Sequence, residues 1–237
     1  MLVKTKAIVI STLKYNEKSL IVKCLTRVNG IQTYFIHNAF TGKNNKQKKV
    51  FFQPLNQIEI EAYHNNKNNL QRIKEVKIYY PYHSIYLDII KSSIVLFLSE
   101  ILHNIIKEEG KDEQLFDYLE SALQWFDTQE EMFNFHLVLL LQLTKYLGFY
   151  PQENLSDKKY FNISEGVFSE TQSLNSLTIE ESELLKRLLR LKFEDNQKVF
   201  SVIQRQQLLK IVLDYYKYNI ERFKTPSSLQ VLKEVFN

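Results

Sequence analysis

The residues with the clearest chemical character lie between Thr41 and Lys49, in the sequence TGKNNKQKK. This stretch has no acidic and no apolar side chain, so it has nothing to bury and is expected to form a solvated loop. Its lysines are Lys43, Lys46, Lys48 and Lys49. Ammonium groups on a loop beside a small sheet suit contact with the phosphate backbone of a nucleic acid. A solvated hairpin tip without a ligand is the alternative that the loop alone leaves open.

Other basic side chains fall on strand ends and connecting loops of the same predicted sheet. They are Lys14, Lys18, Lys23 and Arg27. Aromatic residues are interleaved with them, and exposed rings on a small barrel stack on bases at about 1–3 kcal/mol per base. Of the neighbours Tyr34 and Phe35, only one side chain can point inward, and we expect Phe35 inside and Tyr34 outside, available for stacking. The predominance of lysine over arginine favours contact with the backbone over reading of base edges.

A second basic group lies in the last third of the chain, beside leucine-rich helix faces. Its main members are Lys186, Arg187, Arg190 and Arg205. A hydrophobic pocket rimmed by such side chains would suit a short acidic peptide that ends in a carboxylate. The alternative is a solvated helix face, which is the more common role of helical charges.

Motifs for catalysis and metal binding are missing from the sequence. Gly42-Lys43 lacks the upstream glycine and the following Ser or Thr of a phosphate-binding loop, and the five histidines stand apart from one another. Cys24 is the single cysteine, so neither an internal disulfide nor a cysteine zinc site is expected. The sequence therefore predicts a protein that is not an enzyme and uses no metal or cofactor.

The charges are distributed unevenly along the chain. Residues 1–80 hold fourteen Lys and Arg against four acids, a net charge of +10, whereas the remainder holds 17 bases against 23 acids. Such an asymmetry indicates a polyanion-binding module joined to a different kind of body. Charges interrupt the longest apolar helix candidate, residues 85–106, and the N-terminus does not resemble a signal peptide. We therefore expect a soluble, cytoplasmic protein without a membrane partner.

The elements that must position these side chains change character near Pro81. Short runs of β-branched and apolar residues, joined by turns such as Asn29-Gly30, predict five strands and a small barrel of the OB or SH3 kind. The expected strands are Ala7–Leu13, Leu20–Leu25, Ile31–Ile36, Ile58–Tyr63 and Leu70–Tyr79. The sequence therefore predicts an α+β protein with a barrel domain at 1–80 and a mostly helical domain at 81–237.

Helical periodicity dominates after Pro81. The second predicted helix turns Leu115, Leu119, Ala122 and Phe126 inward, and a third runs from about residue 130 to 147. An irregular insertion at about 152–177 contains a possible miniature hairpin that turns at Glu165-Gly166. Capping boxes then predict two helix starts, one at Thr178 with Glu181 and one at Ser201 with Gln204.

In this order the pieces resemble the bacterial recombination mediator family RecO. Thr26–Gly30 is similar to the family's "T-x-x-x-G" element, and FQPLNQIEIEAY, Phe52–Tyr63, is similar to its "L-Q-P-hydrophobic" strand. LTKYLGFYP, Leu143–Pro151, resembles the "L-G-hydrophobic-x-P" signature. Near the end, RQQLLKIVLDYY and SSLQVL resemble the family's last two helices. The similarity runs the length of the chain.

The resemblance implies an N-terminal OB barrel on a helical domain and a role in DNA repair by homologous recombination. It implies binding of single- and double-stranded DNA, annealing of complementary strands, and loading of a recombinase with a RecR partner. It also implies contact with the C-terminal tail of single-strand-binding protein, and a nucleoid-associated location. Many members carry a four-cysteine zinc element, but residues 152–172 hold no cysteine here, so no metal is carried over. The alternative is a non-enzymatic interaction scaffold that acts through the helical domain, with an incidental basic barrel.

Overall fold

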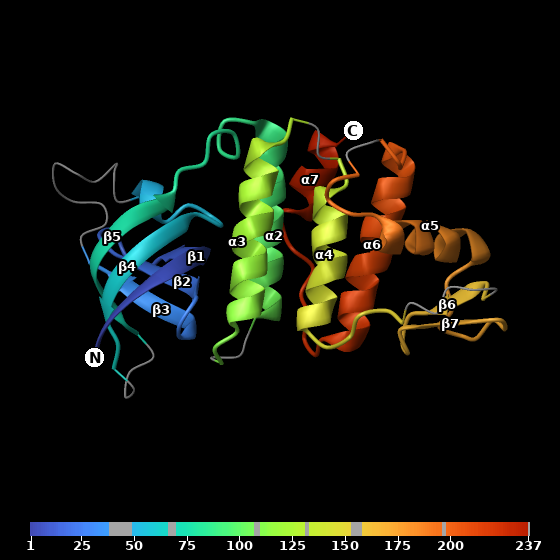
Figure 1. The fold of residues 1–237 in the computed structure, drawn as a ribbon, viewed down its shortest axis with the longest axis horizontal. Coiled ribbons are helices and arrows are strands. Elements are labelled where there is room, and N and C mark those ends of the chain that lie inside the picture. Colours follow the sequence, from blue (N-terminus) through green and yellow to red (C-terminus); the bar gives the residue numbers. More distant parts are fainter. Residues whose placement is uncertain are drawn as a thin grey trace. The chain divides into compact units, whose positions relative to one another are not determined.

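The computed structural model describes residues 1–37, 49–65, 70–106, 110–130, 133–152, 158–195 and 198–236. The chain forms two compact units, shown with their elements in Figure 1. The first unit combines Met1–Thr128 with Pro226–Leu232, and the second combines Gln129–Thr225 with Lys233–Asn237. The predicted boundary at residue 80 falls at the end of the last barrel strand, whereas the compact unit continues through two helices. That domain boundary stays a prediction.

The first unit is built around a five-stranded antiparallel sheet in the order β3-β2-β1-β4-β5. Its strands are β1 (Leu2–Lys14), β2 (Leu20–Thr26), β3 (Gly30–Ile36), β4 (Gln57–Tyr63) and β5 (Arg72–Tyr80). The two outer strands join in parallel, because Gln71 donates its N–H to Thr33 O at 2.8 Å and Phe35 donates to Gln71 O at 3.0 Å. This closure makes the sheet an OB barrel, which confirms the predicted fold class and decides between the two barrel types.

Alternation along the strands fills the barrel. On β4 the side chains of Ile58, Ile60 and Ala62 are buried in the core, whereas Glu59 and Glu61 are only partly buried. The predicted turn at Asn29-Gly30 is also present, and Gly30 adopts φ 62°, which an L residue with a side chain rarely does. These features are local in the sequence, which explains why patterning identified them.

The expected orientation of Tyr34 and Phe35 is wrong. Tyr34 is 0% exposed inside the barrel, and Phe35 lies half-buried on the outside. The hydroxyl of Tyr34 is 3.0 Å from Nε2 of His64, so the buried phenol keeps a hydrogen-bond partner. That partner offsets the cost of burying a hydroxyl, and Tyr34 is therefore not available for stacking on a base.

Two helices complete the main body of the first unit. They are α2 (Ile89–Ile105) and α3 (Glu113–Thr128). Asp88 caps α2 by accepting from the N–H groups of Ile90 and Lys91 at 2.8 and 2.9 Å. The predicted inward face of α3 is confirmed, and its residues Leu115, Leu119, Ala122 and Phe126 are buried.

Asp127 near the end of α3 holds the segment that leads from the barrel into α2. Its buried carboxylate accepts from the N–H groups of His83, Ser84 and Ile85 at 2.8, 2.8 and 3.1 Å. Burial raises the pKa of this carboxyl, but the three backbone donors outweigh burial and leave the pKa below its ordinary value. A charged hydrogen-bond acceptor therefore fixes the chain after Pro81.

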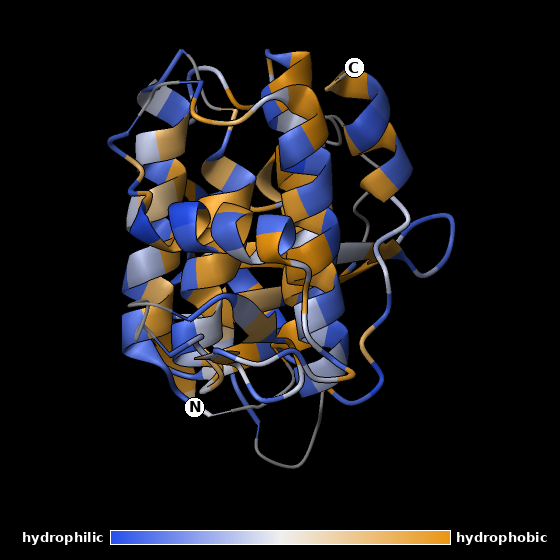
Figure 2. Cartoon of the chain, turned by 90° about the vertical axis from the view of Figure 1, so that its right-hand side faces the viewer, coloured by the Kyte–Doolittle hydropathy of each residue, from blue (hydrophilic) through white to orange (hydrophobic). Residues whose placement is uncertain are grey.

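In its described residues the second unit contains three helices and a small hairpin, and the residues of a short terminal helix are divided between the two units. The helices are α4 (Phe135–Tyr146), α5 (Ile179–Arg190), α6 (Val202–Asn219) and the terminal α7 (Leu229–Val235); the hairpin pairs β6 (Tyr160–Asn162) with β7 (Val167–Ser169). Both predicted capping boxes and the predicted hairpin are confirmed. Helix α4 begins at Phe135 instead of near residue 130, and nine of its twelve residues are buried, as its apolar sequence indicates. Figure 2 shows how hydrophobic and hydrophilic residues alternate along the helices.

The hairpin is anchored on the second unit's own core. Phe161 and Phe168 from its two strands pack with Tyr215 of α6. Gly166 turns the hairpin at φ +69°, and an added Cβ would lie 2.5 Å from the Tyr215 hydroxyl. Glycine is therefore required at this turn for its conformation and for space. None of the helices in the described ranges combines the length and the hydropathy that a membrane span needs.

Candidate nucleic-acid interface

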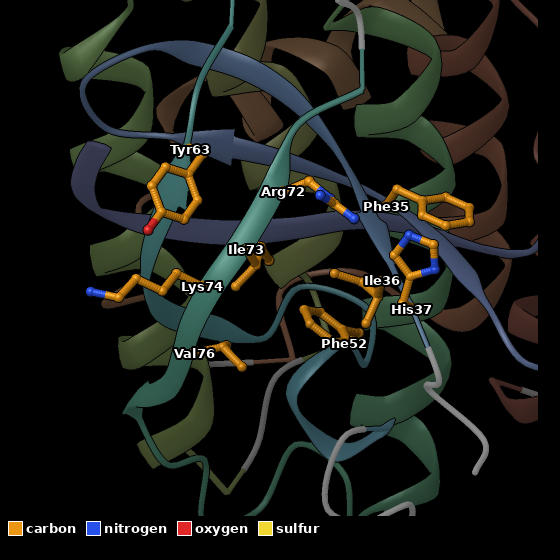
Figure 3. Close-up of a pocket in the computed structure, with 9 residues that line it drawn as sticks. All are labelled: Phe35, Ile36, His37, Phe52, Tyr63, Arg72, Ile73, Lys74 and Val76. Carbon is orange, nitrogen blue, oxygen red and sulfur yellow. The ribbon is translucent and has the colours of Figure 1, made fainter. Parts of the chain in front are cut away.

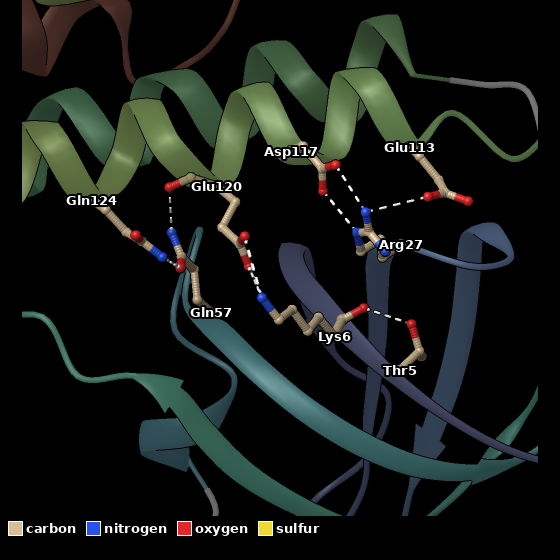
Figure 4. A network of polar contacts seen from close by, with 8 residues as sticks. All are labelled: Thr5, Lys6, Arg27, Gln57, Glu113, Asp117, Glu120 and Gln124. Atoms are coloured by element: carbon tan, nitrogen blue, oxygen red, sulfur yellow. Dashed lines mark hydrogen bonds and ion pairs between the residues drawn. The ribbon is translucent and has the colours of Figure 1, made fainter.

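Apart from Lys49 and Arg72, the basic barrel residues that the structure describes fall into three sets that the sequence does not distinguish. The first set faces the helices of the same unit (Figure 4). Arg27 donates to both carboxylate oxygens of Asp117 at 2.8 and 3.0 Å and lies 3.3 Å from Glu113. The guanidinium holds the pKa of Asp117 below its ordinary value. Arg27 is thus already paired with two acids of α3.

Lys6 and Lys23 belong to the same set. Lys6 Nζ lies 3.2 Å from a carboxylate oxygen of Glu120 on α3. Lys23 donates to the carbonyl oxygens of His103 and Ile106 at 3.5 and 3.1 Å, at the C-terminal end of α2, where a cation is favoured by the helix dipole. The predicted site residues Lys23 and Arg27 therefore lie on the helix-facing side of the barrel.

The second set is paired within the sheet. Lys4 and Lys77 share the carboxylate of Glu59 at 3.3 and 2.9 Å, and Lys74 lies 2.9 Å from Glu61. Hydrogen bonding from Lys77, and then from Lys4, lowers the pKa of Glu59. The acids of β4 therefore neutralise the charge of Lys4 on β1 and of Lys74 and Lys77 on β5.

The third set lies at the end of the barrel where β1 turns into β2. Lys14 ends β1, Lys18 is in the connecting loop, and both are exposed. Tyr15 between them is 62% exposed and meets Phe35 edge to face, with ring centroids 5.5 Å apart. Phe35 in turn contacts His37 at 4.5 Å between centroids. Cations and rings therefore gather at this end, as a site for a nucleic-acid strand requires.

The predicted lysine loop follows β3 in the sequence. Lys43, Lys46 and Lys48 lie outside the described residues, which end at His37 and resume at Lys49. Lys49 is exposed.

A hollow of about 410 Å³ adjoins the same rings (Figure 3). Its apolar lining comes from the end of β3, from β5 and from the segment before β4, and the residues are Ile36, Phe52, Ile73 and Val76. Its remaining lining residues are Phe35, His37, Tyr63, Arg72 and Lys74. The sequence does not identify Arg72 as a site residue. The feature that could have indicated it is its place at the start of β5, the strand that lies beside β3.

Non-covalent binding is the chemistry that this arrangement supports. Ammonium and guanidinium groups attract phosphate, and aromatic rings and apolar walls accept the faces of bases. Among the described residues no group of three or more His, Cys, Asp or Glu side chains is placed to hold a metal ion.

Most side chains of the second basic group form hydrogen bonds to backbone carbonyl oxygens of their own unit. Lys186 is 7% exposed and donates to Lys158 O at 2.6 Å while pairing with Glu183 at 2.5 Å. Arg187 donates to Val199 O at 2.6 Å. These two side chains therefore bind the segments around the ends of α5.

Arg205 is also used internally. It is 8% exposed, donates to Phe200 O at 2.8 Å, and lies over the rings of Phe133 and Phe236 at 5.2 and 5.8 Å. Arg187 and Arg190 are the exposed members of the group, whereas Lys186 and Arg205 are buried. The structure thus does not bring the four predicted peptide-binding residues together on one exposed rim.

Comparison with known proteins accounts for the whole chain. Residues 1–82 match the family model described as "Recombination protein O N terminal", and residues 86–229 match "Recombination protein O C terminal". A "DNA repair protein RecO" of Flavobacterium psychrophilum is 52% identical over 238 residues, which cover 100% of both chains. Proteins of the same name from Flavobacterium johnsoniae and Christiangramia forsetii are 51% and 41% identical, again over 100% of both chains.

Proposed function

Because the chain belongs to the RecO family of DNA repair proteins, we propose that it is a recombination mediator that binds single- and double-stranded DNA and anneals complementary strands. In this proposal it also assists the loading of a recombinase onto strands coated by single-strand-binding protein. The observation that carries the proposal is that the basic residues of the barrel have two different surroundings. Lys6, Lys23 and Arg27 are engaged by the helices, whereas Lys14 and Lys18 stand exposed beside aromatic rings.

The exposed end of the barrel would bind the DNA backbone without reading its sequence. Lysine makes flexible point-charge contacts with phosphate, and these contacts release counterions. We include Lys43, Lys46, Lys48 and Lys49 in this surface because the segment that carries them comes directly after Phe35 and His37 in the sequence. Loose contacts of this kind suit annealing, since both strands must remain able to move until their bases pair.

The proposed activity is non-covalent, so it needs neither a catalytic residue nor a cofactor. Its proposed partners are DNA, a RecR protein and the acidic C-terminal tail of single-strand-binding protein. For that tail we propose the basic group of the second unit, with exposed Arg190 as the point of first contact. Lys186, Arg187 and Arg205 would then act by holding the surrounding backbone.

A salt-dependent binding and annealing assay on the full chain tests the proposal. Changing all four loop lysines to Glu should weaken binding of a fluorescent single strand severely and flatten its dependence on salt. The matched control changes four exposed lysines elsewhere to Glu, with the same change in net charge: Lys192, Lys210, Lys224 and Lys233. Equal losses in the two variants would show that net charge, and not the loop, determines the affinity.

A protein-interaction scaffold is the second candidate, because three basic residues of the second unit are built into its own structure and the unit has a separate core. Titration of a labelled acidic C-terminal tail peptide separates the two functions. Peptide binding in the absence of any DNA binding or annealing would favour the scaffold and reject the mediator.

A further inference from the structure

The barrel is open along part of the seam between β3 and β5. In the described part of the chain, the backbone bonds across this seam are those of Gln71 with Thr33 and Phe35. Next to these bonds, partly buried side chains of the barrel line the hollow. Ile36, Ile73 and Val76 are partly buried there, packed against the barrel core. The hollow is thus an apolar slot that leads into the barrel.

The rim of the slot carries the cationic side chain of Arg72. It is exposed, and no described carboxylate pairs with it, whereas Lys74 on the same strand is held by Glu61 at 2.9 Å. Figure 3 shows the guanidinium of Arg72 directed toward Phe35 and His37 across the mouth of the hollow. An arginine at the mouth of an apolar slot suits a ligand with a flat apolar part joined to an anion.

We propose that the slot takes a single unstacked nucleobase of a DNA single strand, with Arg72 on the adjoining phosphate. The volume of about 410 Å³ lies within the range of small-ligand sites, roughly 300–1,000 Å³. A base inside a duplex is paired and stacked, and therefore cannot enter without being extruded. The slot therefore adds a preference for single strands to a barrel that, in the proposed function, also binds duplex DNA. This inference rests on the proposed function and adds to it a subsite and a strand preference.

The contribution of the slot is measured by comparing the affinities of the full chain for two strands of equal length and charge. One is oligothymidine, and the other is an abasic strand that has the same sugar-phosphate backbone without bases. The wild-type protein should bind the thymidine strand more tightly by roughly 5- to 150-fold, the effect of stacking one base. The abasic strand measures the lysine contacts alone.

Filling the slot should remove the preference and spare the backbone contacts. Val76→Trp places a large ring in the hollow without changing the charge, and it should bring the thymidine affinity close to the abasic affinity. Val202→Trp is the matched control, since Val202 is exposed on α6 of the other unit, and its two affinities should equal those of the wild type. Phe35→Ala, at a half-buried residue on the rim, is a second variant, and it should reduce the preference severalfold.

The outcomes separate this inference from the proposed function. If wild type binds the two strands equally, or if folded Val76→Trp and Phe35→Ala keep the full preference, the slot does not take a base. If neither strand binds, the proposed function fails. If Val76→Trp loses binding of an apolar partner peptide but keeps its preference for the thymidine strand, the slot is a protein-binding site and the inference is wrong.

Discussion

Replacing Arg27 should weaken the fold and leave strand binding unchanged. Arg27→Gln removes two hydrogen bonds to Asp117, at 2.8 and 3.0 Å, and a contact with Glu113 at 3.3 Å. Exposed ion pairs contribute about 0.2–1 kcal/mol, and the side chains of Arg27 and Asp117 are 39% and 48% exposed. The bidentate geometry and the second acid place this cluster at the upper end. We expect a small loss of stability that lowers the Tm by roughly 2–4 °C.

The contrasting variant combines Lys14→Gln with Lys18→Gln. For a single strand, each lost phosphate contact reduces the slope of log K against log salt by about 0.7, so the pair should reduce it by about 1.4. Its unfolding free energy should change by less than about 0.5 kcal/mol, as for other surface substitutions.

Salt titrations of strand binding and thermal unfolding of both variants test this contrast. Arg27→Gln should have the wild-type salt slope, and the lysine variant should have the wild-type Tm. If the salt slope of strand binding falls as far in Arg27→Gln as in the lysine variant, the reasoning is refuted, because the face of the barrel under α3 would then take part in binding DNA.

Three further substitutions test the packing. Asp127→Ala should cost about 3–5 kcal/mol at neutral pH because three backbone N–H groups lose a charged acceptor. Since the folded pKa of this carboxyl is lowered, its contribution is present above the unfolded value of 3.8 and is lost as pH falls further, so urea unfolding of wild type and variant should converge in acid. Gly166→Ala should cost about 2–3 kcal/mol in the same assay, through its positive φ and the collision with the Tyr215 hydroxyl. Tyr34→Phe should lower the unfolding free energy by about 0.5–1.5 kcal/mol by removing the bond to His64, with unchanged strand affinity.

Local features of the fold could be predicted from the sequence. The alternation on β4, the turn at Gly30, the capping boxes and the hairpin at Gly166 each depend on a few neighbouring residues. The barrel follows from them because five short strands with these turns have few closed arrangements.

The division of the basic surface could not be predicted, because it depends on partners that are distant in the sequence. Arg27 pairs with Asp117, 90 residues away, and nothing in the spacing of either residue indicates the other. The orientation of Tyr34 likewise depends on His64, which supplies a partner for the buried hydroxyl. The hollow forms where the end of β3 meets β5, so its residues share no sequence motif.

The discontinuous composition of the first unit has a consequence for synthesis. Ser227 and Ser228 donate to the carboxylate of Glu100 at 3.0 and 3.2 Å, and Leu232, which belongs to the same unit, is 1% exposed. A ribosome releases the barrel and α3 long before it delivers these residues. The barrel can therefore close early, whereas the helical side of the unit is completed after the second unit has been synthesised. A nascent chain that stops before Pro226 should accordingly be more sensitive to protease in its first unit than the finished protein.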